Sequence, residues 1–211
     1  MGIQMKIIAH RGFWKTENEK NQLQSFENAF SNGFGIETDI RDLNGKVVIS
    51  HNPASDSCPN FEELLELWVK YDKPTLALNI KSDGLYLIIE DIFEKYQLDK
   101  SDYFVFDSSV PEQYVYLKRG YNVFTRSSEF EKEICFWEES NGVWLDQFTD
   151  SGHIEAEFDR LINSGKKIAV VSPELHKRDN IRLWEFFYQY RNYDNFVLCT
   201  DEPDKAREYF K

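Results

Sequence analysis

Short apolar runs alternate with longer stretches of mixed polarity along nearly the whole chain. Runs rich in Ile, Val, Leu and Phe occur at 7–9, 76–80, 103–106, 168–171 and 196–199. The stretches between them repeat apolar residues at the spacing of one helix face, as Leu23, Phe26, Ala29 and Phe30 do. Strands that alternate with helices in this way predict parallel β/α units rather than a sandwich of antiparallel sheets.

Eight strand–helix units can be counted if the run 47–50 is treated as an outgrowth of the second unit, joined to it by a turn at Asn44-Gly45. The remaining strands are expected at 36–40, 122–124 and 143–145. We therefore expect an α/β fold, a single TIM-type (β/α)8 barrel that occupies residues 1–211 as one domain. A chain of 211 residues lies near the lower size limit of such barrels, so its insertions should be short.

Polar residues stand at the ends of the early strands. His10 and Arg11 follow the first strand, Glu37 and Asp39 belong to the second, and His51 follows the outgrowth. Active sites of β/α barrels lie at the carboxyl ends of their strands. One such residue alone is more often an ordinary half-buried histidine or an exposed strand edge. Two histidines and two acids together indicate a site for acid/base chemistry around a cation.

These residues belong to short motifs that span nearly the whole chain: His10-Arg11-Gly12, Asn21-Gln22-Leu23-Gln24-Ser25-Phe26, Glu37-Thr38-Asp39-Ile40, His51-Asn52, Leu78-Asn79-Ile80-Lys81 and Thr200-Asp201-Glu202-Pro203-Asp204. In this order they resemble the motifs of the glycerophosphodiester phosphodiesterase family, within the superfamily of phosphatidylinositol-specific phospholipase C-like barrels. The resemblance implies metal-assisted hydrolysis of a glycerophosphodiester-like substrate, either a small molecule or a lipid head group.

A metal site is expected at the second strand. Glu37 and Asp39 alternate along it, so their side chains point to the same side. Two like charges so close require a cation, and hard oxygen ligands favour Mg²⁺ or Ca²⁺ over zinc. The resemblance implies a third ligand at position 79, where the family has Glu and this chain has Asn79. The amide oxygen can coordinate but adds no charge, so we expect weak metal binding.

The resemblance also implies the acid and the base. His10 and His51 would flank the scissile phosphodiester, because an imidazole with an ordinary pKa near neutrality suits proton transfer at physiological pH. Arg11 and Lys81 would hold the phosphate oxygens, and Arg126 is a further candidate.

Three positions depart from the family motifs. Lys20 stands where the family has Glu, Asn52 where it has Asp, and Asn79 again where it has Glu. We therefore expect specificity to have moved away from glycerophosphodiesters with small head groups. Asp201 is expected to cap the helix that begins at Pro203 rather than to take part in the chemistry.

Two other functions stay open at this point. One is a sphingomyelinase-D-like or phospholipase-C-like reaction that closes a cyclic phosphate instead of hydrolysing the diester. The other is a catalytically impaired barrel that binds a phosphorylated ligand. Both histidines together with Glu37 and Asp39 favour an enzyme, whereas Asn79 favours the binding barrel.

Composition narrows the partners. The formal net charge of −12 argues against nucleic acid and against anionic membrane surfaces. Cys58, Cys135 and Cys199 lie far apart without a paired spacing, which indicates reduced thiols in the cytoplasm. No apolar run approaches the length of a membrane span, and the first strand begins too early for a signal peptide, so stable membrane insertion is not expected. The sequence leaves the oligomeric state open.

Overall fold

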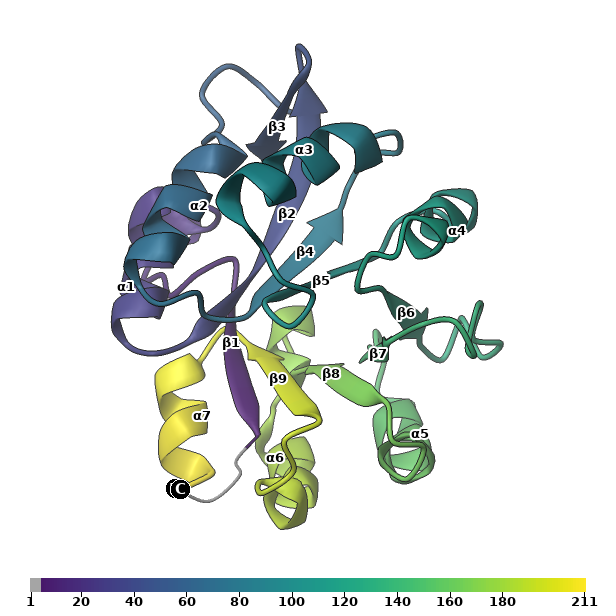
Figure 1. The fold of residues 1–211 in the computed structure, drawn as a ribbon. Coiled ribbons are helices and arrows are strands. Elements are labelled where there is room, and N and C mark those ends of the chain that lie inside the picture. Colours follow the sequence, from purple (N-terminus) through teal and green to yellow (C-terminus); the bar gives the residue numbers. More distant parts are fainter. Residues whose placement is uncertain (1–4) are drawn as a thin grey trace.

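Parallel strands form a nearly closed barrel in the computed structural model, which describes residues 5–211 (Figure 1). Their order around the barrel is β5-β4-β2-β1-β9-β8-β7-β6. The predicted TIM-type barrel is therefore confirmed. The strands are β1 (Lys6–His10), β2 (Gly35–Leu43), β4 (Leu76–Ile80), β5 (Tyr103–Phe106), β6 (Phe124–Ser127), β7 (Gly142–Leu145), β8 (Lys167–Val171) and β9 (Phe196–Thr200).

Helices surround the strands, as Figure 1 shows. They are α1 (Leu23–Ser31), α2 (Phe61–Lys70), α3 (Tyr86–Tyr96), α4 (Val110–Lys118), α5 (His153–Ile162), α6 (Ile181–Phe187) and α7 (Pro203–Tyr209). α2 shows why such segments fold. Asn60 accepts a hydrogen bond from the Glu62 amide, Glu63 accepts one from the Asn60 amide, and the apolar face including Trp68 is buried.

The hairpin of β2 and β3 (Lys46–Ile49) extends one side of the barrel. Its turn is made by Asn44 and Gly45, which both have positive φ angles, so the predicted reversal is confirmed. β3 pairs antiparallel with β2, and the Ser50 amide donates to the Asp39 carbonyl oxygen at 3.0 Å. The hairpin therefore brings the chain back to the carboxyl end of β2.

The unit between β6 and β7 departs from the prediction of eight strand–helix units. Residues 128–141 are all described and form turns and bends instead of a helix. Glu129 and Glu133 would be like charges one turn apart in a helix. Glu129 instead accepts hydrogen bonds from Thr149, and Glu131 pairs with Arg126. This segment lies beside the seam of the barrel, where an isolated bridge between Val105 and Val123 joins β5 to β6.

Aromatic rings fill the barrel interior. Phe104 stacks on Phe124 with ring centroids 4.0 Å apart, and Phe106 stacks on Trp144 at 3.9 Å. Separate apolar clusters lie between the strands and the helices. Within residues 5–211, none of the helices is both long and apolar enough to cross a membrane.

Candidate active site

Sheet register brings four predicted site residues together at the carboxyl end of the barrel. His10 of β1 is the register partner of Glu37 in β2, and Asp39 of β2 is the partner of Asn79 in β4. Because the strands are parallel and adjacent, their polar ends open on the same face. Glu37 and Asp39 are two residues apart, so their side chains point to the same side of β2. They therefore lie beside His10 and Asn79 on the neighbouring strands.

His10 lies between two carboxylates. Its Nδ1 is 2.7 Å from Asp201 Oδ1, and its Nε2 is 3.8 Å from Glu37 Oε2. The expectation that Asp201 caps the last helix was wrong. Glu202 occupies the N-cap position of α7, without a side-chain cap, while the Asp201 carboxylate reaches back to His10. A charged contact with the imidazole is the stronger interaction available to that carboxylate.

Glu37 is the most perturbed acid of the site. Its side chain is buried, and burial followed by the charge of Asp39 raises its pKa to about 7. His10, Arg11 and Lys81 oppose this rise through their positive charges. Near neutral pH, Glu37 is therefore poised between its protonated and ionised forms.

Asp39 is fully buried and is contacted by cations and an amide. Asn21 Nδ2 donates to Oδ2 at 2.8 Å, Arg11 Nε lies 3.0 Å from Oδ2, and Lys81 Nζ lies 3.4 Å from Oδ1. Asn21 is held in turn by the hydroxyl of Thr38, which donates to its Oδ1 at 2.9 Å. The centre of the site is thus filled by its own ion pairs. The sequence motif contained Asn21 but gave no sign of this contact.

The oxygens of the site suit a hard cation. Asp39 Oδ1 and Asn79 Oδ1 are buried and have no hydrogen-bond partner among the described residues. Asp39 Oδ1 still has the Lys81 ammonium group 3.4 Å away, whereas Asn79 Oδ1 has no such partner, and Mg²⁺ or Ca²⁺ would satisfy it. Across residues 5–211, no three His, Cys, Asp or Glu side chains form a group that could hold a metal ion. The oxygen donors that lie together here are Glu37, Asp39 and the Asn79 amide, and their binding of a metal ion stays a prediction.

His51 and Arg126 lie apart from this cluster. His51 is exposed, and its Nδ1 is 3.1 Å from Asn52 Oδ1. The backbone of the preceding residue, Ser50, is nevertheless hydrogen-bonded to the backbone of Asp39. Arg126 forms ion pairs with Asp107, at 2.7 Å, and with Glu131. His51 thus follows β3 near the carboxyl end of β2, and Arg126 is neutralised on β6, which β4 and β5 separate from Asp39 in β2.

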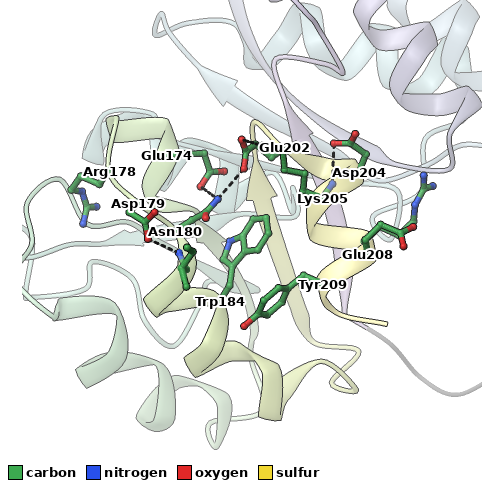
Figure 2. A pocket seen from close by; sticks show the side chains of 12 residues that line it. Glu174, Arg178, Asp179, Asn180, Trp184, Glu202, Asp204, Lys205, Glu208 and Tyr209 are labelled. Atoms are coloured by element: carbon green, nitrogen blue, oxygen red, sulfur yellow. Dashed lines mark hydrogen bonds and ion pairs between the residues drawn. The ribbon is translucent and has the colours of Figure 1, made fainter.

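A hollow of about 940 Å³ lies outside the barrel, between α6 and α7 (Figure 2). Trp184 and Tyr209 form part of its wall, and Asn180 bridges Glu174 and Glu202 at its edge, with both contacts at 3.2 Å. None of the predicted site residues lines it. We therefore place the candidate chemistry at the strand ends and not in this hollow.

The sequence matches no protein-family profile and no curated protein. Solved structures do share the fold. A glycerophosphodiester phosphodiesterase from Parabacteroides distasonis is 17% identical and superposes with a TM-score of 0.75 over 100% of this chain and 98% of that one. A glycerophosphodiester phosphodiesterase from Agrobacterium tumefaciens is 15% identical, with a TM-score of 0.68 over 98% of each chain. At these identities, the likeness establishes the barrel fold.

Proposed function

We propose that this chain hydrolyses a phosphodiester of the glycerophosphodiester type with the help of a divalent metal ion. The observation that carries the proposal is the placement of His10 between Asp201 and the buried Glu37. The solved structures that share the barrel are glycerophosphodiester phosphodiesterases, which supports the same reaction class. The substrate is a small molecule or a lipid head group.

His10 acts as a base in this proposal. The Asp201 carboxylate keeps a proton on Nδ1, which leaves the lone pair of Nε2 directed toward Glu37 and the mouth. Nε2 takes the proton of the attacking water. His51, on the loop that returns beside Asp39, supplies a proton to the leaving alkoxide.

Cations bind the phosphate. Mg²⁺ or Ca²⁺, when held by Glu37, Asp39 and the Asn79 amide oxygen, supplies a Lewis acid for the phosphoryl oxygens. In the free protein, Arg11 and Lys81 form ion pairs with Asp39, at 3.0 and 3.4 Å. When the substrate binds, their side chains turn from Asp39 to the phosphate oxygens. Arg126 contacts a more distant part of the substrate.

A second candidate is a barrel that binds a phosphorylated ligand without turnover. Asn79 lacks the negative charge of the Glu that the resembled family has at this position of the metal site. In addition, Arg11 and Lys81 already neutralise Asp39. A cyclising phosphodiesterase differs from the hydrolase only in its product.

Turnover with product analysis tests the proposal. We expect purified protein with Mg²⁺ or Ca²⁺ to convert a glycerophosphodiester to a phosphomonoester, observed by ³¹P NMR, and a chelator to abolish this activity. His10→Ala and His51→Ala should each lower kcat by about 10²–10⁴. His153→Ala is the control, because His153 contacts Ser127 and none of these groups.

Metal titration separates the candidates. Asn79→Glu adds a carboxylate, so it should tighten Mg²⁺ or Ca²⁺ binding measured by calorimetry. A cyclic phosphate as the only product would favour the cyclising enzyme. Ligand binding without turnover in either protein would favour the binding barrel. Activity that resists the chelator would show that Arg11 or Lys81 serves in place of the ion.

A further inference from the structure

A second hollow, of about 670 Å³, lies at the seam of the barrel. Its walls are the strand ends at Asp107 and Arg126, the start of α4, and the segment 129–135 that replaces a helix between β6 and β7. The hollow exists because this segment folds as turns beside a seam that a single bridge closes. Its volume falls within the range of ordinary ligand pockets, roughly 300–1,000 Å³.

A row of alternating charges connects this hollow to the candidate catalytic centre. Lys81 Nζ lies 3.4 Å from Asp39 and 3.8 Å from Asp107, and Asp107 lies 2.7 Å from Arg126. Asp107 and Arg126 line the hollow. Lys81, which is proposed to hold the substrate phosphate, therefore lies one ion pair away from the wall of the hollow.

The charges of the lining decide which alcohols fit. The lining holds two cations, Arg126 and Lys132, and four acids, which leaves a formal excess of two negative charges: Asp107, Glu129, Glu131 and Glu133. An anionic alcohol is repelled by this lining. Arg126 cannot compensate, because Asp107 and Glu131 already pair with it.

The side-chain amide of Gln113 decides whether a neutral or a cationic alcohol fits the hollow. It lines the hollow and is 7% exposed, and its Nε2 has no hydrogen-bond partner among the described residues. This amide needs an acceptor, which a quaternary ammonium group does not offer. A hydroxyl group accepts from the amide and also donates to the carboxylates. The Phe130 ring, 72% exposed at the edge, offers a flat apolar face.

From these features we propose that the hollow is a subsite for a neutral, polyhydroxylated alcohol of sugar size on the substrate phosphodiester. The proposal rests on the proposed function, which supplies the phosphate position. Gln113 and Phe130 are the specificity-determining residues, and Glu133 accepts from the hydroxyl groups. An alcohol of this size with several hydroxyl groups fits the volume of the hollow, the net negative charge of its lining and the unpaired amide of Gln113.

Steady-state kinetics with two substrates test the subsite. Gln113→Leu keeps the side-chain volume and removes the donor. We expect it, and Phe130→Ala, to raise KM for glycerophosphoinositol about five- to tenfold, as the loss of one hydrogen bond or ring contact would. KM for glycerophosphocholine and kcat for both substrates should not change. Tyr114→Ala is the control, since Tyr114 is an exposed aromatic residue of the same helix outside the hollow.

Binding of free alcohols keeps this test independent of turnover. Saturation-transfer NMR with myo-inositol and with choline needs no hydrolysis, and we expect inositol alone to bind and Phe130→Ala to weaken it. This result would support the subsite even if no diester were hydrolysed. Preference for choline, or equal losses for both substrates in Gln113→Leu and Phe130→Ala, would overturn it. Circular dichroism and thermal unfolding show whether each variant is folded.

Discussion

Asp201 and His10 show what the sequence does and does not reveal at the scale of single residues. His10, Glu37 and Asp39 could be predicted, because each lies in or directly after an apolar strand whose end must open at one face. Asp201 was misassigned because an acid before Pro203 is a common local cap signal. Its actual partner is 191 positions away in the chain, and no local pattern encodes such a contact.

Replacement of Asp201 by Asn tests its role in orienting His10. The amide keeps the size of the side chain but cannot stabilise a protonated imidazole, and it allows the other tautomer. We expect Asp201→Asn to lower kcat by about 10²–10³ with little change in KM. Asp204→Asn, in the first turn of α7, is the matched control. Wild-type kcat in Asp201→Asn would show that the contact is only structural.

Glu37 gives a prediction about stability and pH. Burial and Asp39 raise its pKa from 4.5 to about 7, so the folded protein binds this proton more tightly than the unfolded chain does. The resulting stabilisation is complete below pH 4.5 and is lost as the pH rises through about 7. The shift corresponds to at most about 3 kcal/mol.

Chemical denaturation in the presence of a chelator measures this effect. The free energy of unfolding should fall between pH 5 and pH 8 in the wild type, and it should fall less in Glu37→Gln, which has no carboxyl to ionise. The exposed Glu66→Gln should follow the wild type. Identical pH dependence in wild type and Glu37→Gln would contradict a raised pKa for Glu37.

Among the structural elements, turns with a strong local signal were predictable and the β6–β7 segment was not. Asn44-Gly45 encodes a reversal by itself, because both residues tolerate positive φ angles. The segment 128–141 carries no such signal. Its conformation depends on two residues outside the segment. Arg126 forms an ion pair with Glu131, and Thr149 donates a hydrogen bond to Glu129. The hollow that this creates could not be foreseen for the same reason.

The loop from β1 to α1 should be sensitive to the addition of a single methyl group. Gly12 has φ +89°, and a Cβ there would lie 2.4 Å from Ser25 Oγ and 2.8 Å from the Ser25 backbone. Gly33 has φ +79° with nothing within 4 Å of its Cβ position. Gly33→Ala should therefore cost about 1–2 kcal/mol through backbone strain alone, and Gly12→Ala clearly more, because the loop must also shift.

Thermal unfolding compares the two variants directly. Gly12→Ala should have the lower Tm, and it should also lose activity because Arg11 and His10 precede it. An equal Tm for Gly12→Ala and Gly33→Ala would show that the β1–α1 loop is free to move away from Ser25.

At the scale of the whole molecule, the alternation of strands and helices was enough to predict the barrel. The likeness to solved structures at 17% identity, with a TM-score of 0.75, agrees with a fold that is set by this alternation more than by individual residues. The incomplete pairing of β5 with β6 was not predictable, since closure depends on how many residues of two distant strands meet in register. Cytoplasmic location stays a prediction.

Net charge gives the last prediction. The protein carries a formal charge of −12, so an anionic phosphodiester is repelled at a distance even though Arg11 and Lys81 attract it at the mouth. Salt screens the distant repulsion first, because those charges are exposed and lie beyond a Debye length of about 10 Å at 0.1 M. For an anionic diester such as glycerophosphoglycerol, kcat/KM should therefore rise a few-fold between 10 and 150 mM NaCl at saturating metal. Zwitterionic glycerophosphocholine, with no net charge, should show little change. A steep fall of kcat/KM with salt for the anionic diester would mean that the local cations dominate its approach.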